Sequence, residues 1–311
     1  MSAPRLRFVV SFIASLAIVM SLAVPAAARP RYSEWSVPIW MGATLNTSAV
    51  DFGPGTSRDG LTLYFTSTRG GGVGGEDIWV SYRASTEAPW ETPANLTPLN
   101  TTGSDRVPAL SRDGHWMFFA SDRSGSLGNS DLWASYRLHT DEDFGEFGWQ
   151  TPVNLTSLNS TSYDVGPAFF FDDETATGYL FFASDRPGGA GSHDIYQAVQ
   201  QPDGSFANVT NVTELNSTGQ DARPTLSHDG LEIIFHRADA SGTHLWSATR
   251  ASVGSPWTAP TKIEQLASAG TDVQPSISAD GMTLYFGSSR AGGSGMADLW
   301  MSTRTKVTGK P

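Results

Sequence analysis

Short runs of alternating apolar and polar residues, separated by glycine-rich turns, recur along this chain and predict β-strands. Near the C-terminus a first strand ends at Asp280-Gly281, a second strand follows at Leu284–Phe286, and a third begins at Asp298. An Asp-Gly pair permits a tight hairpin, and the aromatic and β-branched residues suit a buried pleated surface. The pattern predicts antiparallel sheets and no long amphipathic helix.

This strand pattern belongs to a repeat that occurs five times. Each copy starts with an aspartate that is followed three residues later by a proline, and successive aspartates lie 51 to 59 residues apart. We call these the anchor aspartates: Asp51, Asp105, Asp164, Asp221 and Asp272. A period of this length suits a four-stranded propeller blade.

The fourth strand of each copy indicates how the ring closes. Segments such as Trp90 to Asn100 follow the third strand in the first four copies, whereas the fifth copy ends soon after Arg304. A matching segment, Trp35 to Asn46, lies near the N-terminus. We therefore predict an all-β, five-bladed β-propeller as a single domain over residues 29–311. Its N-terminal strand completes the last blade and removes an open sheet edge.

Residues 1–28 have the composition of a cleaved Sec-type signal peptide. Arg5 and Arg7 precede an almost wholly apolar stretch from Phe8 to Val24, and Ala26 to Ala28 offer a small-residue cleavage site. A retained membrane anchor is the alternative. The chain has no cysteine, which excludes lipoprotein attachment and disulfides. We expect a periplasmic or secreted protein without a membrane span after cleavage.

The charge balance narrows the possible partners. Lys and Arg total 20 against 31 Asp and Glu, a net charge of −11, and residues 1–28 contribute only two arginines to it. Such a field disfavours nucleic acid and anionic lipid surfaces. Proteins or glycans of the cell envelope or the exterior remain as partners, and we expect a monomer.

The repeat motifs carry a resemblance to a known family. Each copy follows the order Pro-x-x-Ser-x-Asp-Gly, Leu-Tyr-Phe-x-Ser-x-Arg and Gly-Gly-x-Gly-x-x-Asp-Leu-Trp, most completely in the fifth. This order resembles the WD40-like β-propeller repeat of the TolB family, over all five copies. The resemblance implies an exported interaction platform. The namesake of the family has six blades and a separate N-terminal domain, neither of which is visible in this sequence, so its specific role is not implied.

Comparison between copies separates scaffold from candidate site. Four copies place an arginine after the second strand and an aspartate before the third: Arg69 with Asp77, Arg123 with Asp131, Arg186 with Asp194, and Arg290 with Asp298. The fourth copy has Asp239 and His244 there instead. Because both partners are lost together, we predict that the arginine and aspartate of each pair touch and brace the glycine-rich loop.

The anchor aspartates allow two interpretations. Five carboxylates near one mouth of the channel would offer oxygen ligands to a calcium-like cation, the one cofactor that the sequence leaves open. Alternatively, each aspartate accepts hydrogen bonds from nearby backbone N–H groups and fixes its blade-to-blade turn. Repetition in every blade favours the second interpretation.

Departures from the repeat are the better candidates for ligand binding. Two residues after the anchors the copies read Gly53, Val107, Gly166, Arg223 and Gln274, and Arg106 directly follows the second anchor. The fourth copy is the most divergent. The candidate ligand-binding residues are Arg106, Arg223, His236, Arg237, Asp239, His244 and Gln274. Arginine can fork onto an anionic group, and a neutral histidine can act as base or metal ligand. A degenerate fourth blade with a shorter loop is the alternative.

These features favour a non-catalytic propeller that binds a protein or glycan through its loop face. The alternative is a carbohydrate-active enzyme, a glycosidase or lyase, with carboxylates at the channel mouth. Glycoside hydrolysis needs two carboxyl groups in different roles, whereas Glu76 next to Asp77 is the kind of acid expected on a loop surface. We assign no catalytic residue.

Overall fold

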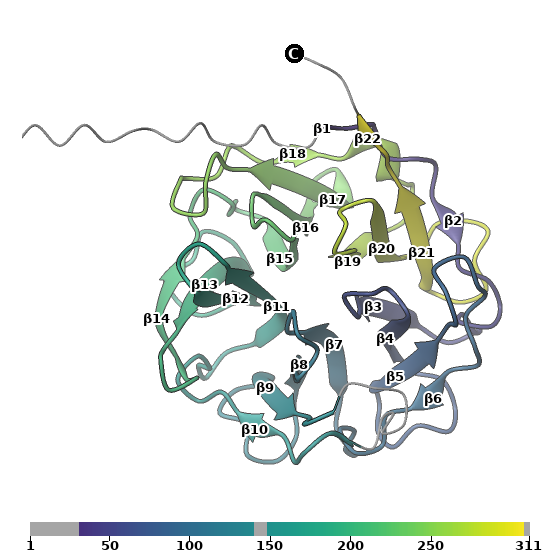
Figure 1. Ribbon diagram of the computed structural model, residues 1–311, viewed down its shortest axis with the longest axis horizontal. Coiled ribbons are helices and arrows are strands. Elements are labelled where there is room, and N and C mark those ends of the chain that lie inside the picture. The colour runs from purple at the N-terminus through teal and green to yellow at the C-terminus, as the bar shows by residue number, and fades with distance from the viewer. Residues whose placement is uncertain (1–30, 140–147, 308–311) are drawn as a thin grey trace, which may run out of the picture.

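The computed structural model describes residues 31–139 and 148–307, which form a ring of five sheets around a central channel (Figure 1). The predicted signal peptide lies outside the described residues. Within residues 31–139 and 148–307, no helix is long and apolar enough to cross a membrane. One short 3-10 turn, η2 (Glu264–Leu266), is present.

Each sheet is one blade of four antiparallel strands. Blade one contains β3 (Asp51–Thr56), β4 (Thr62–Ser67), β5 (Asp77–Tyr82) and β6 (Ala94–Asn95). Blade two contains β7 (Asp105–Leu110), β8 (Trp116–Ser121), β9 (Asp131–Tyr136) and β10 (Val153–Asn154). Blade three contains β11 (Asp164–Asp172), β12 (Thr177–Ser184), β13 (Asp194–Gln200) and β14 (Phe206–Asn211).

The last two blades follow the same order. Blade four contains β15 (Gln220–Leu226), β16 (Glu232–Asp239), β17 (Gly242–Thr249) and β18 (Thr261–Lys262). Blade five contains β19 (Asp272–Ile277), β20 (Thr283–Ser288), β21 (Asp298–Thr303) and β2 (Ile39–Trp40). A separate pair of strands, β1 (Arg31–Tyr32) and β22 (Lys306–Val307), joins the two ends of the described chain. The predicted all-β, five-bladed propeller is confirmed.

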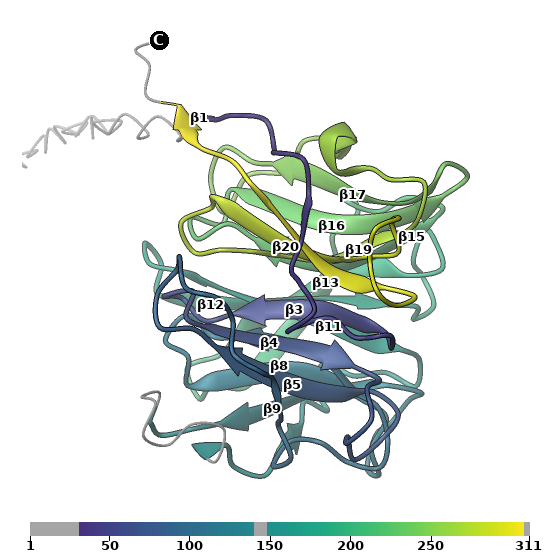
Figure 2. The same cartoon turned by 90° about the vertical axis from the view of Figure 1, so that its right-hand side faces the viewer.

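The N-terminal segment closes the ring, as predicted. It runs down the side of blade five (Figure 2), where Ile39 pairs with Met301 and Trp40 with Trp300. The amide side chain of Asn46 then donates to the carbonyl of Leu299 at 3.1 Å and accepts from its N–H at 2.6 Å. These contacts leave blade five with the same four strands as its neighbours.

The core lies between the blades. Between blades one and two, for example, Tyr64 and Ile78 pack with Met117 and Phe119 in one buried cluster. Each second strand supplies apolar residues with no exposed surface, because both of its faces meet other sheets. In blades one, two, four and five an arginine just after the third strand stacks on a tryptophan, as Arg83 does on Trp90 at 4.3 Å to the ring centroid.

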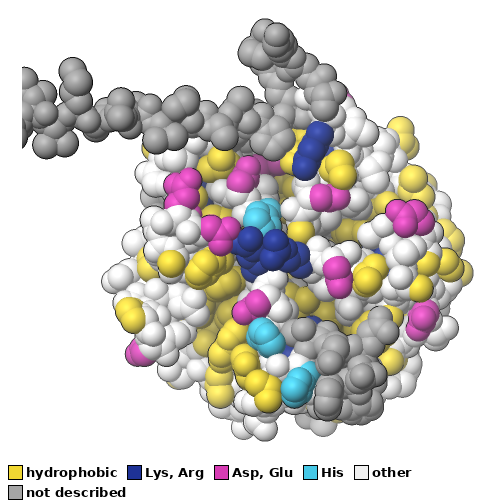
Figure 3. Space-filling model, in the orientation of Figure 1, with side chains coloured by type: hydrophobic (Ala, Val, Ile, Leu, Met, Phe, Trp, Pro, Cys, Tyr) yellow, Lys and Arg dark blue, Asp and Glu magenta, His cyan; other side chains and the backbone are white. Residues whose placement is uncertain are grey.

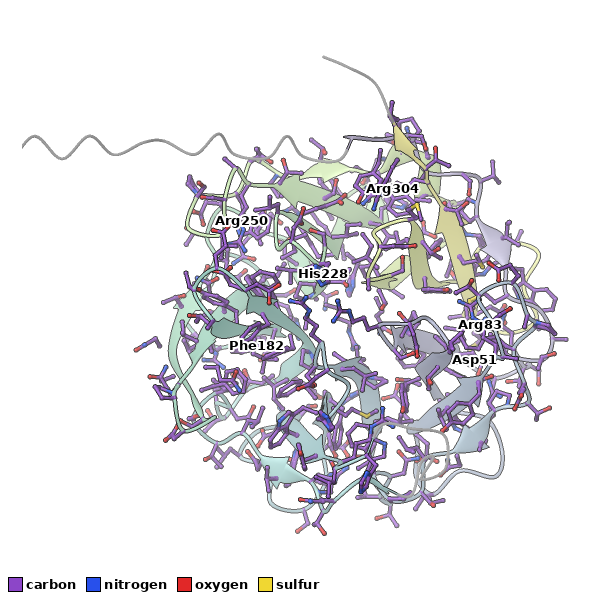
Figure 4. All side chains as sticks on the ribbon, in the orientation of Figure 1. Asp51, Arg83, Phe182, His228, Arg250 and Arg304 are labelled. Carbon is purple, nitrogen blue, oxygen red and sulfur yellow. The ribbon has the colours of Figure 1, made fainter. Side chains whose placement is uncertain are left out.

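The contact between blades four and five differs from the others. In the other blades the glycine-rich loop presses on the next blade; a Cβ added at Gly74 would lie 2.0 Å from the carbonyl oxygen of Gly103. Blade four has a tight hairpin instead, in which Asp239 pairs with Gly242. On the opposite face Arg304 of blade five forms a two-pronged ion pair with Glu232 of blade four, at 2.9 and 2.6 Å. Figure 4 labels Arg304 beside blade five.

Candidate functional site

The first strand of every blade carries a bulge at the channel. The pairing register shifts two residues after each anchor aspartate, as between Phe52 and Gly55. The residue at this point has a left-handed backbone in all five blades: Gly53 (φ 60°), Val107 (54°), Gly166 (62°), Arg223 (56°) and Gln274 (55°). Glycine adopts this conformation freely, whereas Val107, Arg223 and Gln274 are strained there. Strain of this kind is often kept at functional sites.

Two of these strained residues extend over the glycines beside them. A Cβ added at Gly166 would lie 2.7 Å from Cγ of Arg223, and one added at Gly53 would lie 2.9 Å from Oε1 of Gln274. The glycines therefore make room for the Arg223 and Gln274 side chains. A cavity of 130 Å³ lies in the channel here, and Val107, Gly166, Arg223 and Gln274 line it together with the repeat prolines.

Arginines concentrate positive charge at this mouth, which we call the anchor-face mouth. Arg106 pairs with Glu76 through Nη1 and Oε2 at 2.8 Å. Burial, reinforced by repulsion from Arg106, lowers the pKa of Arg223 to about 10, while Glu76 opposes the shift. Arg223 remains protonated at neutral pH, so two guanidinium groups lie near the one carboxylate of Glu76.

Polar atoms of this mouth are buried without a partner among the described residues. They are Nη1 of Arg223, Nε of Arg106 and Oε1 of Gln274. An unmatched buried polar group is costly, and a charged one more so. The arrangement offers two donors and one acceptor to an oxygen-rich anionic ligand.

His236 has a structural role, which is to hold the bulge at Gln274. Its Nδ1 lies 3.4 Å from the backbone nitrogen of Gln274 and accepts that N–H, as Thr66 Oγ1 accepts the N–H of Val107 at 2.8 Å between blades one and two. Burial, followed by the charges of Arg223 and His193, lowers the pKa of His236 to about 3. The imidazole is therefore neutral at physiological pH and positions Gln274.

Arg237 has a structural partner. Its Nε donates to Oδ1 of Asp221 at 2.5 Å, and its Nη2 donates to the carbonyl of Leu215 at 2.8 Å. In blade one, Arg69 makes the matching contacts with Asp51 and the carbonyl of Leu45, both at 2.5 Å. Blade four thus keeps the brace by using an arginine two residues earlier, in β16.

The predicted brace between the loop arginine and the third-strand aspartate is wrong. Arg69, Arg123, Arg186 and Arg290 pair with the anchor aspartates of their own blades at 2.5 to 2.6 Å. The third-strand aspartate serves the loop backbone instead: Asp77 accepts the N–H groups of Val73 and Gly74 and the side-chain amide of Asn95. Both residues are lost together in blade four because the whole loop is missing, not because they touch.

Asp239 and His244 lie apart from the anchor-face mouth cluster. Asp239 is exposed and bonds to Ser241 in the β16–β17 hairpin, and these bonds lower its pKa. His244 is buried, with Nδ1 3.4 Å from Oδ2 of Asp272 and Nε2 3.2 Å from the carbonyl oxygen of Ser241. The candidates that come together are Arg106, Arg223, His236 and Gln274.

The anchor aspartates are fully buried and separately satisfied. Each accepts a backbone N–H from the residue four positions earlier, and each also pairs with an arginine of its own blade. Residues 31–139 and 148–307 contain no group of three or more His, Asp or Glu side chains suited to hold a metal ion. The geometry matches the hydrogen-bonding interpretation of these residues.

Two aromatic side chains at this mouth, Tyr163 and His193, were not predicted from the sequence. Tyr163, which precedes an anchor aspartate, is 38% exposed, and its ring centroid lies 6.3 Å from that of His193. Nδ1 of His193 is 3.4 Å from Nε2 of Gln220, and burial lowers its pKa despite nearby Asp185. The signal available was their position: each directly precedes a repeat aspartate that begins a strand, Asp164 or Asp194.

A larger groove lies away from these residues. It has a volume of 610 Å³, and its lining includes Trp35, Glu232, Lys262 and Arg304, on the face of the Asp-Gly turns. None of the candidate ligand-binding residues lines it.

Fold and site together define a five-bladed β-propeller with a cationic channel mouth. No protein-family model matches the chain, and no curated protein sequence does so either. An α-L-arabinofuranosidase from Lactobacillus brevis is similar in structure, with a TM-score of 0.58 and 14% identity over 86% of this chain and 95% of its own. An exo-1,5-α-L-arabinanase from a bovine ruminal metagenomic library has a TM-score of 0.58 and 9% identity, over 85% and 100% of the two chains.

A TolB structure is also similar, more distantly. The putative TolB from Agrobacterium tumefaciens has a TM-score of 0.47 and 15% identity over 85% of this chain and 92% of its own. At that score the similarity carries no argument. At these low identities the similarity to the arabinofuranosidase and the arabinanase supports the fold alone and leaves the activity open.

Proposed function

We propose that this protein is an exported, non-catalytic binding module that holds a carboxylate-bearing saccharide at the anchor-face mouth. The observation that carries the proposal is the buried guanidinium of Arg223, whose Nη1 has no partner among the described residues and which lies close to a second arginine. A carboxylate entering the mouth would accept from this guanidinium and compensate its charge.

The surroundings favour a saccharide as the carrier of that carboxylate. Oε1 of Gln274 offers an acceptor, and Glu76 offers a second one, for sugar hydroxyl groups. The exposed ring of Tyr163 offers an apolar face at the same mouth. Sites for small ligands commonly combine such an aromatic wall with a few placed polar groups.

The arrangement of acids argues against hydrolysis. A glycosidase needs two free carboxyl groups about 5–10 Å apart. Here the anchor aspartates are engaged by arginines, and Glu76 is paired with Arg106. Saccharide binding without bond cleavage is therefore the expected behaviour.

A saccharide array that includes uronic acids tests the proposal, with each hit measured by calorimetry and its products analysed. We expect binding of uronates, with at least about a tenfold loss in Arg223→Gly, the effect of removing one charged hydrogen bond. Lys262→Gln removes a positive charge far from the mouth and serves as the matched control.

Two outcomes would overturn the proposal. Equal binding of the uronate by the wild type and by Arg223→Gly would show that the uronate does not bind at Arg223. Cleavage products that disappear in Glu76→Gln would make the protein an enzyme.

A further inference from the structure

The opposite mouth of the channel has its own cluster of charged side chains. In four blades the first hairpin carries Ser-x-Asp-Gly, and the variable residue x is Arg58, Arg112, His228 or Ala279. Blade three has a longer hairpin that places Asp173 there. We call this end of the channel the turn-face mouth.

The turns that carry these residues are firmly held. In blade one, Ser57 Oγ donates to Oδ1 of Asp59 at 2.6 Å, and the N–H of Leu61 donates to the same oxygen at 3.0 Å. The same Ser–Asp bond recurs in blades two, four and five. Side chains at the x position therefore project from fixed points around the turn-face mouth.

Positive charge gathers at the centre of this face. Figure 3 shows Lys and Arg side chains at the middle of the ring with a histidine beside them, and Figure 4 labels His228 at that place. Arg112 pairs with Asp173. Arg58 forms no hydrogen bond or ion pair with any other residue of the described ranges, so its guanidinium is available to a ligand.

A small hollow lies beneath this cluster. Its volume is 130 Å³, and Arg58, Arg112 and His228 share its lining with the aromatic residues Phe169, Phe170 and Phe171. This space equals ~4 water molecules at liquid density. It therefore admits one compact anionic group, while any sugar ring that carries the group stays outside the hollow.

We propose that the turn-face mouth is a second ligand site, which holds a sulfate or phosphate group between Arg58, Arg112 and His228. A sulfate or phosphate group offers at least three terminal oxygens, and the three side chains approach from three different blades. Guanidinium groups match such oxygens with paired N–H donors. The site is independent of the proposed saccharide site at the other mouth.

His228 links this site to pH. Burial lowers its pKa first, and the neighbouring Arg112 and Arg58 lower it further, while Asp173 and Asp229 oppose them. A bound dianion offsets the two arginines and favours the protonated imidazole. Binding of sulfate, whose own charge is constant in this range, should therefore tighten as pH falls from 7 to 5.

Calorimetric titration of the purified protein with inorganic sulfate tests this site, with chloride at equal ionic strength as the reference anion. We expect sulfate to bind more tightly than chloride, and Arg58→Gln or Arg112→Gln to weaken sulfate about tenfold. Asp173→Asn frees Arg112 and should tighten sulfate binding. Lys306→Gln makes the same charge change on β22, and Arg223→Gly empties the other mouth; both should leave sulfate binding unchanged.

Several results would overturn the inference. They are the absence of sulfate binding, an equal loss in Lys306→Gln, or a pH response that persists in His228→Gln. Thermal melts of each variant establish that it is folded. A second series with a sulfated and a phosphorylated monosaccharide distinguishes the two possible sources of the anion.

Discussion

The ion pair between Glu232 and Arg304 offers a sharp test of how the last two blades are held together. The glycine-rich loop that links other neighbouring blades is missing from blade four, and this pair spans the same interface on the opposite face. We expect Glu232→Gln to destabilise the protein markedly, although it changes no volume.

The magnitude follows from burial. The Arg304 side chain is 6% exposed and that of Glu232 is 17% exposed. Exposed pairs contribute about 0–1 kcal/mol, whereas breaking a fully buried pair costs about 3–5 kcal/mol. The guanidinium carbon of Arg304 also lies 3.9 and 4.3 Å from the ring centroids of Tyr32 and Trp35. Because these rings already hold the side chain, forming the ion pair does not have to immobilise it. We expect a coupling energy of about 2 kcal/mol.

A double-mutant cycle with Glu232→Gln and Arg304→Met, read by urea unfolding, measures that coupling. Methionine keeps an apolar stem between the two rings. The internal control is Tyr285→Phe, since the equivalent Arg83 reaches the Tyr285 hydroxyl only at 3.4 Å; we expect a loss below about 1 kcal/mol. A coupling energy under about 0.5 kcal/mol would refute the assigned role of the pair.

Three further predictions concern the channel. Because the pKa of His236 is lowered to about 3 from 6.5, the unfolded chain takes up a proton below pH 6.5 that the native state excludes. The free energy of unfolding should therefore fall by about 2 kcal/mol between pH 7 and pH 5 through this residue, and His236→Thr, which copies blade one, should remove that part of the pH dependence in urea titrations. Arg223→Gly should raise stability by about 1 kcal/mol while weakening uronate binding, since glycine adopts φ 56° without strain; a stability loss would contradict the strain argument. Gly166→Ala should lower the free energy of unfolding by about 1 kcal/mol more than Gly188→Ala and displace Arg223. Both glycines have positive φ, but only at Gly166 would the added Cβ meet a neighbour within 4 Å. Equal melting temperatures of the two variants would contradict the close packing.

The repeat made the architecture predictable. Asp and Pro at fixed offsets, hairpin turns and aromatic second strands define blade after blade, so blade number and ring closure follow from counting copies. It was harder to predict from the sequence which charged side chains pair with one another. Arg69 and Asp77 vary together along the sequence, but the cause is a shared loop and not a contact. Arg237 shows the same limit. It makes the brace to the anchor aspartate of blade four from a position two residues earlier than in the other blades, so an alignment of the copies shows the arginine as lost.

The candidate site was predictable only where it departs from the repeat. Arg223 and Gln274 stand where blades one and three have glycine, and that irregularity identified them. Tyr163 and His193 each adjoin a repeat aspartate, which indicates the face on which they lie. Their residue types vary between blades, however, so nothing in one sequence marks them as neighbours of each other. Side-chain direction at a bulge depends on the left-handed backbone, which is evident only in three dimensions.

The closure of the ring has a consequence for the order of events during folding. Asn46 bonds to Leu299 across a separation of 253 residues, so β2, near the N-terminus, finds its partner only after blade five has been synthesised. Contacts between distant parts of a chain slow folding, because a long loop must be closed before they form. Until blade five exists, β2 has no sheet to join, and the edge of β21 stays open to another chain. The final step is thus the docking of a short N-terminal segment, and a peptide that copies residues 35–46 should compete with it.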